Sequence, residues 1–233
     1  MRVACLPDTQ RWTSVGAELD ERGYGLIPGL LAPGECEELA GGYDSGQFRS
    51  TVVMARHGFG SGEYKYYCYP LPALVTELRS ALYEPLVPIA NRWQAALGSP
   101  TRYPTDLAAF LKQCHSRGQS RPTPLILRYR PGDYNCLHQD VYGPSLFPLQ
   151  VAVLLSGPAS FTGGEFVLTE QRPRRQSRAQ VVPLGQGDAV VFPVRDRPIR
   201  GTRGFYRVQH RHGVSEIRSG QRHTLGLIFH DAA

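Results

Sequence analysis

The pattern of hydrophobic and polar positions divides the chain into a helical first half and a second half of short strands. In the first half, apolar residues recur every three or four positions, which is the period of an amphipathic helix. The pattern predicts helices from Thr13 or Ser14 to a stop at Gly23, over residues 35–40, from Pro72 to about Leu97, and from Thr105 or Asp106 to near Gly118. Pro85 and Pro88 fall inside the third of these segments, and we expect them to kink or divide it.

From Pro124 onwards the period changes. Short apolar runs bounded by Gly, Pro, Asn or Ser are typical of the strands of a sandwich or jelly roll. These runs cover residues 125–127, 149–155, 166–168, 181–184, 189–194 and 224–229. Two other segments do not fit a helix or a buried strand. Residues 47–69 predict a long loop with some strand, and residues 171–180 are so charged that we place them in an exposed loop.

Helices followed by strands, without a low-complexity linker, indicate one domain over residues 1–233. Residues 1–123 are predicted to be mainly helical support, and residues 124–233 to form the β core. The fold class is therefore β-rich α+β, with N-terminal helices that brace a sheet. A chain of 233 residues is long enough to bury such a core.

Cysteine usage and hydropathy bear on the location of the protein. The five cysteines are odd in number, scattered and never spaced as CxxC, which argues against a disulfide framework and a zinc site. No apolar run approaches the roughly 18 to 20 residues that a membrane helix needs. Residues 1–10 lack the apolar centre of a signal peptide. We therefore expect a cytoplasmic protein without a membrane partner.

The charge of the chain is unevenly distributed. The net charge is +6, yet residues 171–222 contain 12 arginines and three acidic residues, a local net charge of +9. The remainder of the chain is therefore about −3. A basic region of this kind is compatible with an anionic partner such as nucleic acid, or with a solvated arginine-rich surface. Charge alone leaves both interpretations open.

The candidate chemistry lies in three residues that are far apart in the chain. His138 and Asp140 form an HxD pair, and residues two apart on a strand point to the same side. His212 is available as a third ligand from a distant strand. Two histidines and one carboxylate on one face of an octahedral Fe(II) leave positions open for a cosubstrate and dioxygen. Arg222, ten residues after His212, is predicted to lie on a strand that pairs with the strand of His212 and to bind a carboxylate.

Other histidines compete for the role of the third ligand. The competitors are His57, His115, His210, His223 and His230. His212 is preferred to His210 because of its ten-residue spacing to Arg222. The order of the motifs also supports the choice, since the HxD pair is followed by Gly163-Gly164-Glu165, by Gly187-Asp188, and then by His212 and Arg222.

Several stretches of the sequence carry a resemblance to a known superfamily. They read FRSTVVMARHGFGSGEYKYY, PLVPIANRW, RPTPLILRYRPGDYNCLHQD, FTGGEFVLTEQRPRRQSR and RHGVSEIRSGQRHTLGLIFHDA. Over roughly residues 14–233 the chain resembles the 2-oxoglutarate/Fe(II) oxygenases of the prolyl-4-hydroxylase-like type. Within that superfamily it resembles a bacterial subfamily described as oxygenases acting on damaged nucleic acid.

The resemblance implies a fold, a set of cofactors and a reaction. The fold is a double-stranded β-helix, or jelly roll, and the cofactors are Fe(II), 2-oxoglutarate and dioxygen. The implied catalytic metal ligands are His138, Asp140 and His212. Arg222 is implied to bind the carboxylate of 2-oxoglutarate, and Tyr129 is implied to help bind the same carboxylate. The implied reaction hydroxylates a substrate C–H bond and releases succinate and CO2.

The substrate stays open between three classes. A methylated base in DNA or RNA is favoured by the local charge and by the subfamily, which would make the protein a DNA-repair demethylase. Demethylases of alkylated DNA usually carry a second arginine six residues after the first, and Ile228 stands there in this chain. A peptidyl or amino-acid side chain and a small metabolite are the alternatives, while a decayed binding module is disfavoured because every ligand type is present. Candidate substrate contacts are Tyr64, Tyr66, Asn135, Gln139, Tyr142, Arg172, Arg174, Arg175 and Arg178.

Overall fold

Two antiparallel sheets form the centre of the structure. The computed structural model describes residues 6–233, so Cys5 and the start of the polar amino terminus lie outside it. The larger sheet has the order β1 (Gly25–Ile27), β11 (Ala189–Pro193), β7 (Leu149–Leu154), β15 (Arg222–Ile228), β5 (Leu125–Tyr129), β4 (Glu63–Tyr67) and β2 (Phe48–Val53). The smaller sheet has the order β10 (Arg178–Val182), β9 (Phe166–Gln171), β13 (Gly204–Val214), β6 (Tyr134–His138) and β3 (Gly60–Ser61), and β12 (Asp196–Gly201) also pairs with β13. A separate pair joins β8 (Phe161–Gly163) to β14 (Ile217–Gly220).

Four α-helices accompany these sheets in the described part of the chain. They are α1 (Thr9–Arg22), α2 (Pro33–Gly41), α3 (Ala73–Ala96) and α4 (Leu107–Ser116), with short 3-10 turns at Gly42–Asp44 and Met54–His57. The helix α1 begins earlier than the sequence predicted, because the Asp8 carboxylate accepts a hydrogen bond from the backbone N–H of Arg11 and caps the helix there. Its predicted stop is confirmed, since Gly23 has a left-handed φ of 85°.

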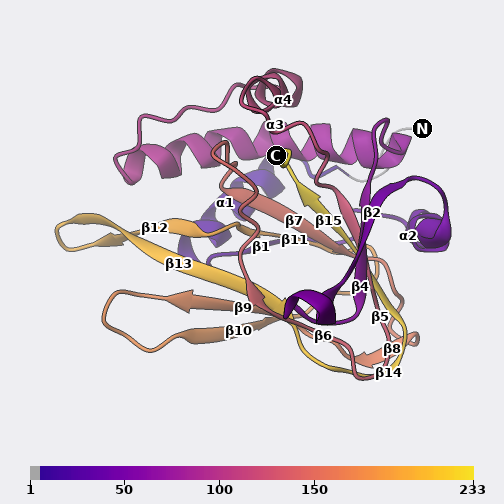
Figure 1. Cartoon of the computed structure of the whole chain (residues 1–233). Helices are drawn as coiled ribbons and strands as arrows, with labels where there is room; N and C mark the ends of the chain where they lie inside the picture. The colour runs from indigo at the N-terminus through magenta and orange to yellow at the C-terminus, as the bar shows by residue number, and fades with distance from the viewer. Residues whose placement is uncertain (1–5) are drawn as a thin grey trace.

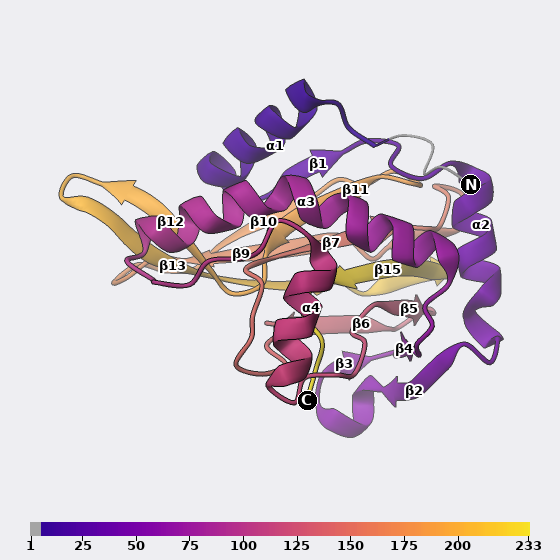
Figure 2. The ribbon, with the colours of Figure 1, turned by 90° about the horizontal axis from the view of Figure 1, so that it is seen from above.

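The long helix α3 runs without a break through Pro85 and Pro88. Of the two outcomes expected, a kink or a division, the division does not occur. A proline inside a helix costs about 3 kcal/mol, whereas each buried large apolar side chain contributes about 1.5–3 kcal/mol. The inner side of α3 buries many such residues against the larger sheet, including Leu82, Leu86 and Trp93. Figures 1 and 2 show α1 and α3 over the same face of this sheet.

Two segments that were predicted as loops contain more strand than expected. Residues 47–69 supply β2, β3 and β4, and Phe48 packs on Tyr67 across the first pair with ring centroids 4.7 Å apart. Residues 171–180 hold the end of β9 and the start of β10, which form a hairpin. The strand β10 is an edge strand whose one charged residue, Arg178, is exposed, while its backbone pairs with β9.

The two sheets pack face to face around a small apolar cluster. Its members come from both sheets and are Ala152, Phe166, Leu168, Val182, Val190 and Phe192. The β9–β10 and β12–β13 hairpins project together at one end of the molecule, on the left in Figure 1. The four cysteines that the structure describes are not in disulfides. Within residues 6–233, none of the helices combines the length and apolar character that crossing a membrane requires.

Candidate active site

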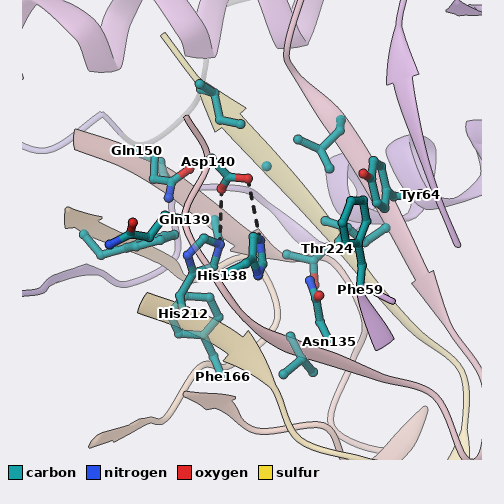
Figure 3. Close-up of a pocket in the computed structure, with 18 of the residues that line it drawn as sticks. Phe59, Tyr64, Asn135, His138, Gln139, Asp140, Gln150, Phe166, His212 and Thr224 are labelled. Atoms are coloured by element: carbon teal, nitrogen blue, oxygen red, sulfur yellow. Dashed lines mark ion pairs between the residues drawn. The ribbon is translucent and has the colours of Figure 1, made fainter. Parts of the chain in front are cut away.

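Two histidines and one aspartate converge between the sheets. His138 is the last residue of β6, and His212 lies opposite it in the register of β13. The two histidines and Asp140 bring one ligand atom each to within 4.8 Å of one another. The Nε2 atom of His212 is 3.3 Å from Oδ2 of Asp140, and Nε2 of His138 is 3.6 Å from Oδ1. Figure 3 shows the carboxylate of Asp140 facing both imidazoles.

Hydrogen bonds from outside the cluster orient two of its members. The Nδ1–H of His138 donates to the backbone carbonyl of Cys136 over 2.8 Å, so that Nε2 keeps a free lone pair. The hydroxyl of Tyr142 donates to Oδ1 of Asp140 over 2.6 Å, and the hydroxyl of Tyr66 donates to that of Tyr142 over 3.0 Å. The cluster is therefore supported by a second layer of side chains.

The pKa values of Asp140 and His212 are shifted toward the forms that bind a metal ion. Burial alone would raise the pKa of Asp140, but the hydrogen bond and charge of His212, together with the charge of His138, hold this pKa well below its usual value. Burial also lowers the pKa of His212, with a further contribution from the charge of His138. An ionised carboxylate and a neutral imidazole are the ligand forms that Fe(II) requires.

His210 and His212 differ in their neighbours, and only His212 belongs to the group that could hold a metal ion. Both residues are buried on β13. The side chain of His210 accepts a hydrogen bond from Nε of Arg197 over 3.1 Å and lies 3.8 Å from Glu170. It therefore belongs to a separate buried ion-pair cluster, whereas His212 faces Asp140.

Arg222 is a buried cation without an ion-pair partner among residues 6–233. Its side chain is 1% exposed, lines the same pocket as the three candidate ligands, and has no carboxylate within 4.0 Å among the described residues. One of its terminal nitrogens donates to the hydroxyl of Thr224, while its Nε has no hydrogen-bond partner among the described residues. Burial lowers the pKa of Arg222 to about 10. An unpaired buried guanidinium fits a bound carboxylate.

The sequence analysis predicted that the strand of Arg222 pairs with the strand of His212, and this prediction was wrong. Arg222 begins β15 in the larger sheet, opposite Tyr129 of β5, whereas β13 belongs to the smaller sheet. The chain crosses between the sheets through β14 and Gly220, whose φ is 77° and where a side chain would collide with the carbonyl of Ser160. The pocket therefore receives Arg222 and the candidate metal ligands from opposite walls.

The sequence-based candidates divide into three groups by their position. Tyr64, Asn135, Gln139 and Tyr142 line the pocket, as does the fully buried Tyr129. Tyr66 lies behind this lining, where it contacts Tyr64 and Tyr142. The third group consists of the basic residues of the β9–β10 hairpin, and none of them lines the pocket: Arg172, Arg174, Arg175 and Arg178.

Sequence reasoning missed most of the apolar lining of the pocket and, beside it, three residues that bear on its chemistry. Thr224 holds Arg222, the exposed ring of Phe59 lies at the pocket, and Gln150 is buried in its wall. Gln150 had a detectable signal, because it is the single polar residue in the apolar run 149–155. Phe59 had none, since its position depends on how residues 47–69 fold.

Comparison with known proteins agrees with this geometry. Residues 62–232 match the model of a family described as an oxygenase catalysing oxidative methylation of damaged DNA. The uncharacterized proteins MT2286 and Rv2227 of two Mycobacterium tuberculosis strains are 52% identical over 165 residues, which is 70% of this chain and 71% of theirs. A prolyl-4-hydroxylase structure from Pseudomonas putida has a TM-score of 0.55 at 15% identity, over 95% of this chain and 99% of that one. A 2OG-Fe(II) oxygenase structure from Burkholderia pseudomallei has a TM-score of 0.57 at 15% identity, over 100% and 98%.

The fold and the site together define a class of enzyme. It is the 2-oxoglutarate-dependent Fe(II) oxygenases with a double-stranded β-helix, which use Fe(II), 2-oxoglutarate and dioxygen. Within this class, the chain belongs to the oxygenase family whose model matches residues 62–232. The fold class and the enzyme class predicted from the sequence are confirmed.

Proposed function

We propose that His138, Asp140 and His212 hold Fe(II), and that Arg222 binds the distal carboxylate of 2-oxoglutarate beside the Tyr129 hydroxyl. The observation that carries this assignment is the occurrence of a three-ligand cluster and an unpaired buried guanidinium in one pocket. Iron in this position supplies the activation of dioxygen. The protein supplies the ligands, the anchor for the cosubstrate and an apolar lining that excludes water.

The proposed reaction oxidises an N-methyl group. One oxygen atom of O2 enters succinate as 2-oxoglutarate loses CO2, and the other is inserted into a methyl C–H bond of the substrate. The resulting N–CH2OH group then loses formaldehyde when its C–N bond breaks and the hydroxyl proton moves to nitrogen. The base is thereby restored.

The proposed substrate is a methylated base in nucleic acid. The description of the matching family and the +9 charge of residues 171–222 support this class. A base that is flipped or already single-stranded would enter the pocket beside aromatic residues such as Phe59 and Tyr64. Because the hairpin arginines lie outside the pocket, their role in this proposal is to contact phosphates rather than the base.

The experiment that tests this function measures succinate from 2-oxoglutarate, with Fe(II), across methylated oligonucleotides, proline-containing peptides and small metabolites. We expect at least one methylated oligonucleotide to increase the release of succinate, and formaldehyde to appear in an amount equal to that increase. Stimulation by peptides or metabolites alone would assign the protein to one of those substrate classes instead. If no 2-oxoglutarate is consumed and His212→Ala leaves Fe(II) binding unchanged, the assignment of the metal ligands is wrong.

A further inference from the structure

Asp140 lies outside the sheets, so its position depends on the loop that follows it. The strand β6 ends at His138, and residues 141–147 lead from Asp140 towards β7 without belonging to a helix or a strand. We call these residues the 141–147 loop. Because no strand pairing holds this loop, contacts with other parts of the fold must fix its conformation.

The side chain of Gln119, which follows α4, makes the main polar contacts with this loop. Gln119 is fully buried, and its Oε1 accepts a hydrogen bond from the backbone N–H of Ser145 over 2.6 Å. Its Nε2 donates to the backbone carbonyl of Ser145 over 3.0 Å and to that of Asp231 over 2.6 Å. Both donors of the amide and its carbonyl oxygen are therefore used. This single side chain ties the 141–147 loop to the C-terminal segment.

Two further contacts hold the same loop. Gly143 has a φ of 141°, and a Cβ atom at this position would lie 2.6 Å from Cδ of Gln119. The loop therefore packs so closely on the Gln119 amide that position 143 requires glycine. At the other end of the loop, the backbone N–H of Phe147 donates to Nδ1 of the buried His230 over 3.3 Å.

The C-terminal segment to which Gln119 binds is itself fixed. The carboxylate of Asp231 is fully buried, accepts hydrogen bonds from Arg79 of α3 over 2.7 Å and from Tyr69 over 2.9 Å, and lies 2.8 Å from Nε2 of His115 in α4. Figure 2 shows the C-terminus beside α4. Gln119 therefore connects the 141–147 loop to a part of the fold that both helices hold in place.

We propose that Gln119 is a positioning residue for the metal site, because it fixes the 141–147 loop so that the Tyr142 hydroxyl stays on the carboxylate of Asp140. Tyr142 belongs to this loop, directly before Gly143, and donates to Oδ1 of Asp140 over 2.6 Å. The inference rests on the proposed function, in which Asp140 is a ligand of Fe(II). Partners that orient a metal ligand are commonly worth 10- to 100-fold in metal affinity. Gln119 acts through Tyr142, so its effect should lie at the lower end of this range.

The test uses Gln119→Leu, which removes the amide at similar volume. In the metal-free protein, the backbone amide of Ser145 should lose its protection against hydrogen exchange, because Oε1 of Gln119 is its acceptor. The dissociation constant for Mn(II) should rise roughly tenfold by calorimetry. In a Tyr142→Phe background, Gln119→Leu should cause little further loss of Mn(II) affinity, because the path from Gln119 to Asp140 is already broken. A general loss of stability would instead weaken Mn(II) binding equally in both backgrounds.

Thr123→Val is the matched control. Thr123 is equally buried and donates to the backbone carbonyls of Ile228 and His230, so the variant loosens the C-terminal segment without touching the 141–147 loop. Its Mn(II) affinity should equal that of the wild type. If Gln119→Leu does not fold, Gly143→Ala carries the same test, because the added methyl group pushes the loop away from Gln119.

Three results would overturn the role of Gln119. They are a wild-type dissociation constant for Mn(II) in Gln119→Leu, an equal loss of affinity in the Tyr142→Phe background, and an equal loss in Thr123→Val. The same inference fails if Gly143→Ala, used in place of an unfolded Gln119→Leu, keeps wild-type Mn(II) affinity. Unchanged Mn(II) affinity in Asp140→Ala would instead overturn the proposed function. The two failures are distinguishable, because the first leaves Asp140→Ala defective in Mn(II) binding.

Discussion

Arg222→Met should weaken cosubstrate binding without weakening the fold. Burial lowers the pKa of Arg222 to about 10, from an ordinary value of 12.5. A cation with a lowered pKa is less favourable in the folded than in the unfolded protein, by on the order of 3 kcal/mol for this shift. Methionine removes that penalty and the hydrogen bond to Thr224, while it fills similar space. The free energy of unfolding of the metal-free variant should therefore be unchanged or about 1–3 kcal/mol higher.

The affinity for 2-oxoglutarate should change in the opposite direction. Loss of a bidentate, buried partner of a carboxylate costs on the order of 2–4 kcal/mol, or roughly 30- to 1000-fold in the dissociation constant. Anaerobic titration with 2-oxoglutarate in the presence of Mn(II) measures this constant. At a hundredfold excess over the wild-type dissociation constant, the cosubstrate should stabilise the wild type by about 2.7 kcal/mol, and at the same concentration it should stabilise the variant by less than about 1 kcal/mol.

Arg197→Met provides the matched control. Arg197 is equally buried, but it pairs with Glu170 and donates to the backbone carbonyl of Asp20. Breaking this pair should cost about 3–5 kcal/mol of stability and leave 2-oxoglutarate affinity unchanged. Undiminished 2-oxoglutarate affinity in Arg222→Met would refute the assignment. Strong destabilisation of Arg222→Met in the absence of cosubstrate would contradict the view that Arg222 is held for a ligand.

Four further predictions concern the metal site, the hairpin and the histidines. Alanine at any of the three proposed iron ligands should abolish the visible charge-transfer band of the anaerobic Fe(II) and 2-oxoglutarate complex, whereas His210→Ala should retain it; the reverse result would exchange the two histidines. Tyr142→Phe removes the hydrogen bond to Asp140 and should weaken Mn(II) binding about 10- to 100-fold by calorimetry, so that an unchanged constant would exclude a positioning role. Changing the four hairpin arginines to glutamate should abolish binding of single-stranded DNA, while 2-oxoglutarate turnover without substrate persists. In the wild type, the logarithm of the binding constant should fall with the logarithm of the salt concentration at a slope near −0.7 per neutralised phosphate. Equal DNA binding by both proteins would place the interface elsewhere. Burial lowers the pKa of His210 and of His230 to about 4, so the unfolded chain takes up protons at a higher pH than the folded protein does. The free energy of unfolding should therefore fall as the pH drops from about 6.5 to 4, by on the order of 3 kcal/mol per histidine. A urea midpoint that stays constant over this pH range would contradict the prediction.

Local interactions made several features readable from the sequence. Gly23 ends α1 and Asp106 caps α4 through contacts within a few residues, and the apolar runs of the second half became strands because their period matches a buried sheet face. The HxD pair was readable from its spacing, although β6 ends at His138 and Asp140 lies just beyond the strand. The family resemblance then supplied the fold and the cofactors.

Contacts between distant segments decided the rest. Pro85 and Pro88 remain inside α3 because burial against a sheet, made by residues far along the chain, outweighs their local cost. The sequence could not place Arg222 and His212 in different sheets, because β15 and β13 take their partners from separate parts of the chain. Gln150 was placed in the wall of the pocket only by the structure, which brings β7 beside the proposed metal ligands. Burial and hydrogen bonding are properties of the whole packing, so a residue's own neighbours in the sequence do not determine them.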